Sequence, residues 1–166
     1  MGFESFQIIL RGGSHTPSET AQIIRKMPNV KPDQRFLTTS TYFVVDDGQH
    51  VIEVELDNDM PIRVSCRFIL SHPPSIDSVF LEFARRLMAK LGMEATICDD
   101  VRPEHERLFS LDQFAEFTAA ACDYIAASRR FWIAEMGPEQ VATRKDLYER
   151  IILPKCEPVA ELIHRE

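Results

Sequence analysis

The chain has 166 residues, 45% of them hydrophobic, which suits a single domain that buries its own core. Its 19 basic and 26 acidic residues give a formal net charge of −7, which repels a phosphate backbone and argues against nucleic-acid binding. The sequence shows no signal peptide, no apolar run near the roughly 20 residues of a membrane span and no CxxC pair, so we expect a cytoplasmic protein without a membrane partner.

A strand, a loop and a capped helix open the chain. Apolar side chains lie on both faces of residues 3–10, which predicts a centrally placed strand. The glycine-rich loop of residues 11–15 follows, and Thr16 then begins the pattern of a capping box, which predicts a helix. Pro28 and Pro32 lie beyond that helix, and we expect a loop there.

Three further runs with strand-like composition and alternation follow at residues 35–45, 50–56 and 62–70. Asp and Gly residues at 46–49, and the Asp-Asn-Asp sequence at 57–59, predict the turns between them. Antiparallel pairing across the second turn would bring acidic residues of one strand near basic residues of the next. These charged residues are Glu53, Glu55, Arg63 and Arg67.

The remaining elements are mainly helical. Apolar residues at helical spacing predict a helix at residues 75–91, and a short strand follows at 95–98. Ser110 begins a capping box for a helix of some 25 residues, about 37 Å, which is longer than the strands, so we expect its end to overhang. A Gly-Pro pair at 137–138 ends this helix, and residues 139–153 form a final amphipathic helix.

Together these elements predict an α+β fold in the order β-α-β-β-β-α-β-α-α, with a mostly antiparallel sheet of four to five strands and a C-terminal helical hairpin. One domain spans residues 1–153, and residues 154–166 form a tail. The first two helices cover one face of the sheet. The other face also carries apolar residues, so either the helical hairpin or a second subunit in a homodimer covers it. These apolar residues are Phe3, Ile9, Val51 and Ile69.

The alternating direction of successive elements predicts which loops meet. If each strand or helix crosses the domain once, the loops after the first, second, fourth and fifth predicted strands lie at one edge of the sheet. These loops are residues 11–15, 46–50, 71–72 and 98–100, whereas 57–59 lies at the opposite edge. All candidate site residues belong to the four loops at the shared edge.

The loop at residues 11–15 is the candidate anion-binding site, because glycines let the backbone approach a ligand and the next helix presents N–H groups. Its ligand-binding residues are Arg11, Gly12, Gly13 and Ser14. His15 and His72 are the candidate general acid or base. We do not expect Ser14 and His15 to act as nucleophile and base, because no nucleophile motif surrounds them.

No metal or cofactor is expected. The histidines and acidic residues of the four loops lack metal-binding spacing, and acidic residues at turns commonly bond to their own backbone. The chain also has no glycine motif of the phosphate-binding kind. The basic and aromatic residues at 129–132 suit the anchoring of a helix on its own core or on a partner chain better than stacking on bases.

The sequence favours a non-enzymatic protein-binding domain, such as an acidic inhibitor or immunity-type protein for a basic partner. The candidate protein-contact residues are Asp46, Asp47, Asp99 and Asp100. The alternative is a small enzyme or anion-binding domain that uses the four loops, including His50 and Cys98. A deep pocket at the shared edge would favour that alternative.

Overall fold

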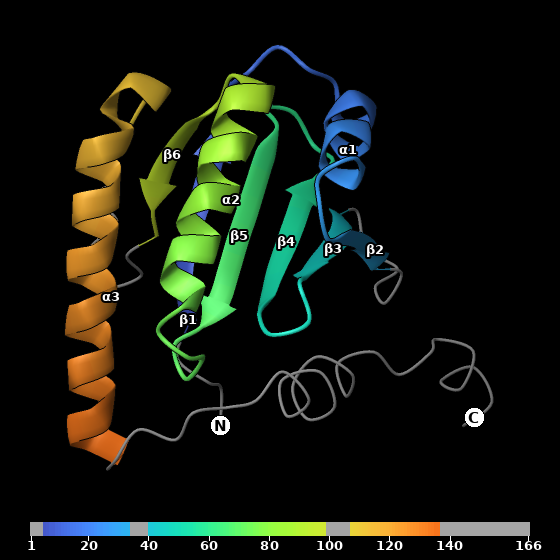
Figure 1. The fold of residues 1–166 in the computed structure, drawn as a ribbon. Helices are drawn as coiled ribbons and strands as arrows, with labels where there is room; N and C mark the ends of the chain where they lie inside the picture. Colours follow the sequence, from blue (N-terminus) through green and yellow to red (C-terminus); the bar gives the residue numbers. More distant parts are fainter. Residues whose placement is uncertain (1–4, 34–39, 99–106, 137–166) are drawn as a thin grey trace, which may run out of the picture.

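The computed structural model of the protein describes residues 5–33, 40–98 and 107–136. In these ranges the chain is an α+β domain with a six-stranded sheet in the order β2-β3-β4-β5-β1-β6, and neighbouring strands are antiparallel (Figure 1). The predicted fold class is therefore confirmed. The strands are β1 (Ser5–Arg11), β2 (Val30–Asp33), β3 (Ser40–Asp46), β4 (Val51–Asp57), β5 (Arg63–Ile69) and β6 (Glu94–Ile97), and the helices are α1 (Pro17–Arg25), α2 (Ile76–Leu91) and α3 (Phe114–Met136), with a short 3-10 helix at Leu111–Gln113 before α3.

The strand β2 is absent from the sequence-based prediction, which places a loop between Pro28 and the next strand. β2 lies at the edge of the sheet, and its Pro32 pairs opposite Phe43 of β3. An edge strand tolerates proline because only one of its sides must bond to a neighbour. The two prolines, Pro28 and Pro32, therefore led to the prediction of a loop, although the chain forms a short edge strand there.

This additional strand reverses the direction predicted for the later strands relative to β1. β1 is antiparallel to β5, with Arg11 opposite Arg63. Because Arg63 also pairs opposite Asp57, the loop after Arg11 lies at the edge of the turn that follows Asp57. The prediction that residues 11–15 share an edge with residues 46–50 is therefore wrong. With β2 included, the chain crosses the sheet once more before β3, so residues 46–50 lie at the opposite edge.

The three described helices and the inner face of the sheet enclose one hydrophobic core (Figure 1). At its centre, the fully buried ring of Phe6 in β1 contacts the rings of Phe68 in β5, Phe80 in α2 and Tyr124 in α3, with centroid separations of 5.7, 5.5 and 5.8 Å. One aromatic cluster thus joins the sheet to two of the helices. Its packing fixes the position of the start of α2, which contributes to the site described below.

Local sequence explains where α1 begins and where α2 ends. The predicted capping box of α1 is present, since Thr16 and Glu19 exchange side-chain and backbone hydrogen bonds. α2 buries the predicted apolar stripe and ends at Gly92, which has a left-handed φ of 62° that favours glycine. The buried members of that stripe are Ile76, Phe80, Phe83, Leu87 and Leu91.

α3 extends beyond the rest of the domain, as predicted (Figure 1). Its 23 residues reach about 34 Å, whereas the 7 residues of a strand such as β5 reach about 23 Å. Near its end, Arg129 donates to both carboxylate oxygens of Asp77 at 2.7 Å and to the carbonyl oxygen of Leu70 at 3.3 Å. The predicted anchoring of this helix is therefore confirmed for Arg129.

The sheet face away from the helices carries polar side chains of the central strands. Glu53 of β4 lies opposite Arg67 of β5, and the two side chains form an ion pair as predicted. Glu55 instead lies opposite Ser65 and accepts a hydrogen bond from Tyr42 at 2.9 Å. The cross-strand charge prediction therefore holds for one pair.

Apolar residues on the same face are more buried than an open sheet surface would require. Ile9 and Val51 are 3% and 4% exposed, and Ile69 is half-buried, although no described helix lies over this face. Its covering by a helical hairpin or a second subunit stays a prediction.

Some predicted features lie outside the described residues. These are Phe3, Asp99, Asp100, the predicted helix at residues 139–153 and the tail at 154–166. No helix in the described part of the chain is long and apolar enough to cross a membrane.

Candidate functional site

The loop at residues 11–15 is built for close packing. Gly12 and Gly13 both have a left-handed φ, 85° and 83°. A Cβ atom at Gly13 would lie 2.7 Å from the carbonyl oxygen of Leu91, where α2 ends, so glycine is required by space as well as by backbone angle. Ser14 is exposed and His15 is half-buried in the same loop. Anion binding by Arg11 and its neighbours stays a prediction.

The turn between β3 and β4 holds its two aspartates by hydrogen bonds within the chain. Asp46 is 6% exposed, and its carboxylate accepts from the Gly48 N–H at 3.1 Å and forms an ion pair with Lys31 at 3.1 Å. Asp47 accepts from the N–H groups of Gln49 and His50 at 2.8 and 2.7 Å. Asp46 is thus largely enclosed, in contrast to the exposure expected of a turn residue, whereas the Asp47 side chain is 26% exposed.

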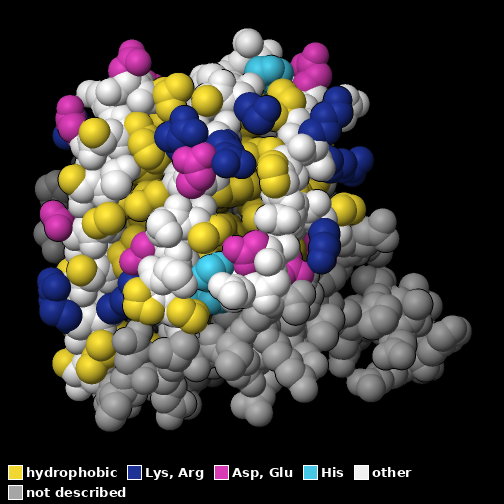
Figure 2. Space-filling model, in the orientation of Figure 1, with side chains coloured by type: hydrophobic (Ala, Val, Ile, Leu, Met, Phe, Trp, Pro, Cys, Tyr) yellow, Lys and Arg dark blue, Asp and Glu magenta, His cyan; other side chains and the backbone are white. Residues whose placement is uncertain are grey.

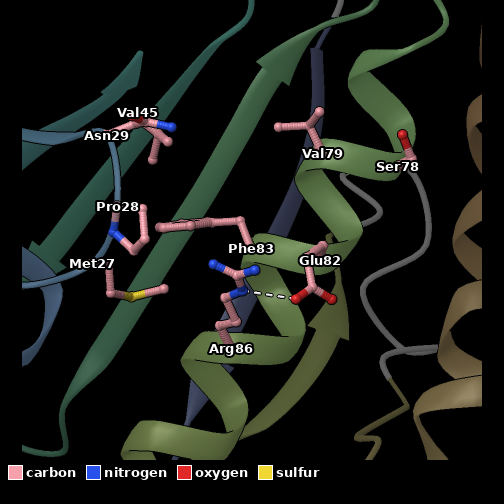
Figure 3. A pocket seen from close by; sticks show the side chains of 9 residues that line it. All are labelled: Met27, Pro28, Asn29, Val45, Ser78, Val79, Glu82, Phe83 and Arg86. Carbon is pink, nitrogen blue, oxygen red and sulfur yellow. Dashed lines mark hydrogen bonds and ion pairs between the residues drawn. The ribbon is translucent and has the colours of Figure 1, made fainter. Parts of the chain in front are cut away.

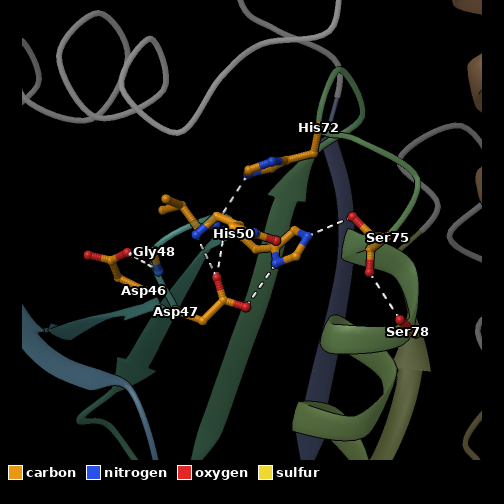
Figure 4. Close-up of polar contacts among 9 residues, drawn as sticks. Asp46, Asp47, Gly48, His50, His72, Ser75 and Ser78 are labelled. Carbon is orange, nitrogen blue, oxygen red and sulfur yellow. Dashed lines mark hydrogen bonds and ion pairs between the residues drawn. The ribbon is translucent and has the colours of Figure 1, made fainter.

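A relay of three side chains crosses from this turn to the start of α2 (Figure 4). Asp47 Oδ2 lies 2.8 Å from His50 Nδ1, and His50 Nε2 lies 2.8 Å from Ser75 Oγ. We name this set, Asp47, His50 and Ser75, the relay. An ionised carboxylate can only accept, so His50 Nδ1 donates to Asp47, and in the tautomer with its proton on Nδ1 the Nε2 atom accepts from the Ser75 hydroxyl.

Burial and hydrogen bonding decide the charge on Asp47. Partial burial raises the pKa of its carboxyl, but the hydrogen bonds from the His50 ring and from the N–H groups of Gln49 and His50 outweigh burial, so the pKa lies below its ordinary value. The carboxylate therefore stays ionised at neutral pH. His50 itself is 7% exposed, whereas Ser75 is an exposed residue, so the relay joins a buried ring to a residue at the surface.

His72 lies beside the relay, with its ring centroid 6.2 Å from that of His50. It is 1% exposed, and its Nε2 accepts the N–H of Val51 at 3.3 Å. Burial lowers the pKa of His72 to about 4, so the ring is neutral at physiological pH and Nδ1 carries the proton. The Nδ1 atom of His72 and the hydroxyl of Ser71 are both buried and have no hydrogen-bond partner among the described residues. An unpaired buried donor costs about 1 to 3 kcal/mol, which marks this corner as unusual.

Two prolines set the conformation in which α2 presents Ser75. The N–H groups of Ile76 and Asp77 bond to the carbonyls of Pro73 and Pro74 at 2.9 and 3.2 Å. The first donors of the helix are thus occupied by the preceding turn. The Ser75 side chain is left to bond to His50, while its carbonyl accepts from the Ser78 hydroxyl at 3.0 Å.

A cavity of about 340 Å³ lies on the helix side of the sheet, between the loop that joins α1 to β2, the end of β3 and α2 (Figure 3). Its lining is mostly apolar, and Ser78 contributes to it three residues after Ser75. Val45, which precedes Asp46, lines it as well. The segments that carry the relay therefore also border the cavity. Its other lining residues are Met27, Pro28, Asn29, Val79, Glu82, Phe83 and Arg86.

The structure divides the predicted site residues between two edges. Asp47, His50 and His72 come together at the edge where β3 and β5 end, whereas His15 lies at the other edge with residues 11–14. Cys98 also lies at the first edge, because its N–H bonds to Gln7 near the start of β1. The described residues include no group of three or more His, Cys, Asp or Glu side chains that could hold a metal ion.

Ser75 is the site residue that the sequence reasoning missed. The spacing of Asp47 and His50 in one turn is a local signal that could have indicated their hydrogen bond. The contact between His50 and Ser75 joins residues 25 positions apart and depends on the order of the strands, which local patterns do not give.

Comparisons with protein-family models, with curated proteins and with solved structures found no match for the chain.

Proposed function

We propose that the chain is a protein-binding domain that acts in the cytoplasm and recognises a partner with a basic surface. The exposed end of α3 carries this proposal. Phe131 and Ile133 are 63% and 37% exposed, although both are large apolar residues. Helical residues two positions apart point about 200° apart, so both flanks of the helix end are open. Exposed aromatic side chains of this kind are typical of protein contacts.

The way α3 is held favours binding by a preformed surface. Arg129 joins the helix to α2 through two hydrogen bonds with Asp77, so the segment next to Phe131 is already ordered before a partner arrives. Binding then costs less conformational entropy. Hydrophobic side chains also reach the surface along α3, on the left of Figure 2.

The net charge of −7 supports a basic partner, because complementary charge speeds the encounter of two proteins. Of the predicted contact residues, Asp47 has the more accessible carboxylate in the described chain, while Asp46 is enclosed and Asp99 and Asp100 lie outside it. We assign Asp47, Asp99 and Asp100 to this steering role. Cys66 and Cys122 are free thiols, which suits a reducing compartment such as the cytoplasm.

The test is capture of the partner on the immobilised full chain, followed by association kinetics with the purified partner. We expect Phe131→Asp to weaken the complex at least about tenfold, because the substitution places a charge in an apolar contact. Met60→Asp is the matched control, since Met60 is 73% exposed in the turn between β4 and β5, at the opposite edge of the sheet. A higher salt concentration should slow association.

Each of the other outcomes would change the proposal. Equal affinity of the Phe131→Asp variant and the wild type would place the contact away from α3. Association that does not depend on salt would exclude charge steering toward a basic surface. If light scattering shows that the wild type is a dimer and that the Phe131→Asp variant is a monomer, the partner is a second copy of the chain.

A further inference from the structure

We propose that Ser75 is a nucleophile that accepts the acyl group of small uncharged esters, with His50 as its general base and Asp47 as the residue that orients His50. This inference goes beyond the binding function and does not depend on it. It rests on the two 2.8 Å contacts of the relay, on the exposure of Ser75 and on the cavity bordered by the segments that carry both.

The geometry meets the requirement for activating a hydroxyl. A serine hydroxyl is a weak nucleophile until a base takes its proton, and the base must itself be held in the correct tautomer by a third group. His50 Nε2 faces Ser75 Oγ, and Asp47 faces His50 Nδ1 on the other side of the ring (Figure 4). Two backbone N–H groups hold Asp47 in turn, so the carboxylate is fixed before any substrate binds.

Burial separates the roles of the three residues. His50 is 7% exposed, so its ring is sheltered from competing water, whereas the hydroxyl it faces belongs to an exposed serine. His72, beside the relay, keeps a buried Nδ1–H that has no hydrogen-bond partner among the described residues.

The reaction balances with water as the only co-reactant. Ser75 Oγ forms a bond to the ester carbonyl carbon while its proton passes to His50 Nε2. The bond to the leaving alcohol breaks, and His50 returns the proton to that oxygen. Water then attacks the acylated serine through the same base, which releases the carboxylic acid and restores the Ser75 hydroxyl.

The cavity indicates the class of acyl group. Its apolar lining suits an alkyl chain, and the serine at 78 places it within one helical turn of Ser75 (Figure 3). Of the charged lining residues, Glu82 forms an ion pair with Arg86 and a second one with Arg85, which lies outside the lining, so neither lining charge is unpaired. The N–H groups of Ile76 and Asp77 are bonded to prolines and do not stabilise an oxyanion, so turnover should be slower than the usual range of about 1 to 1,000 per second.

The test uses the full chain and an alkyl fluorophosphonate, which forms a covalent bond to an activated serine as fluoride leaves. Mass spectrometry of the wild type should locate one adduct at Ser75, and no variant is needed for that result. Ser75→Ala should abolish the labelling, and His50→Gln should slow it at least about 100-fold. Ser18→Ala is the matched control, because Ser18 is an exposed serine on α1. The wild type should also release nitrophenol from p-nitrophenyl butyrate over many turnovers.

The opposing outcomes are equally definite. If the wild type gains no adduct at Ser75, or if Ser75 and Ser18 react at the same rate, the relay is a structural contact that joins the β3–β4 turn to α2. Labelling at Ser75 that does not depend on His50 would exclude general-base activation. Release of a single equivalent of nitrophenol would exclude the hydrolytic half of the reaction.

Discussion

Protonation of His72 should destabilise the protein as the pH falls. The imidazole is 1% exposed, and burial lowers its pKa from 6.5 to about 4. The folded protein therefore takes up this proton less readily than the unfolded chain does. The contribution of the neutral ring to stability is complete above pH 6.5 and is lost as the pH falls from 6.5 toward 4.

The size of this effect follows from the two pKa values. With 6.5 for the unfolded chain and about 4 for the folded protein, the free energy of unfolding should fall by about 2 kcal/mol between pH 7 and pH 5. That is a sizeable part of the roughly 5 to 15 kcal/mol that stabilises a typical domain. Below pH 4 the folded ring is also protonated, and this contribution to the pH dependence ends.

Urea denaturation followed by circular dichroism, at pH 7 and at pH 5, measures the effect. His72→Gln is the informative variant, because glutamine keeps an acceptor for the N–H of Val51 and takes up no proton in this range. A weaker hydrogen bond in this variant would lower stability equally at both pH values, whereas loss of the titrating ring would remove about 2 kcal/mol of pH dependence. If the wild type and the variant lose the same stability on acidification, the burial argument for His72 is refuted.

Three further expectations concern stability. Gly13→Ala should lower the free energy of unfolding by at least about 2 kcal/mol, because its Cβ would meet the Leu91 carbonyl. Gly12→Ala has a similar φ but lies in open space, so it should lower the free energy of unfolding by only about 1 kcal/mol. Equal losses for the two variants in urea denaturation would contradict this expectation. Arg129→Ala should lower the free energy of unfolding by about 2 kcal/mol, and a double-mutant cycle with Asp77→Ala should show that the two losses are coupled. Strictly additive losses would exclude the ion pair as the cause. EDTA should leave the melting temperature unchanged, and a fall would reveal a structural metal ion.

Local periodicity predicted most of the fold. The apolar stripe of α2, its Gly92 cap and the capping box of α1 depend on residues within a few positions of one another, so the sequence determines them directly. The alternation along β4 and β5 also predicted the contact of Glu53 with Arg67. These features need no knowledge of which elements become neighbours.

The site depended on information that local patterns lack. A strand of 4 residues with a proline in it carries too few alternating positions to be recognised, yet its presence sends Gly13 and His72 to opposite edges of the sheet. The contact of His50 with Ser75 required the same knowledge, because the β3–β4 turn and the start of α2 meet only in the correct strand order. One missed element therefore changed the predicted site more than it changed the predicted fold class.

The two edge strands limit the ways in which another protein can bind. At one edge, β2 is short and contains Pro32, which has no N–H to donate to an added strand. At the other edge, Ala95 of β6 already exchanges hydrogen bonds of 3.0 and 2.8 Å with Phe109. Neither edge of the described sheet offers a long unpaired backbone for β-augmentation. A partner of the kind proposed above would therefore contact side chains, and the same protection lowers the tendency of the folded sheet to aggregate edge to edge.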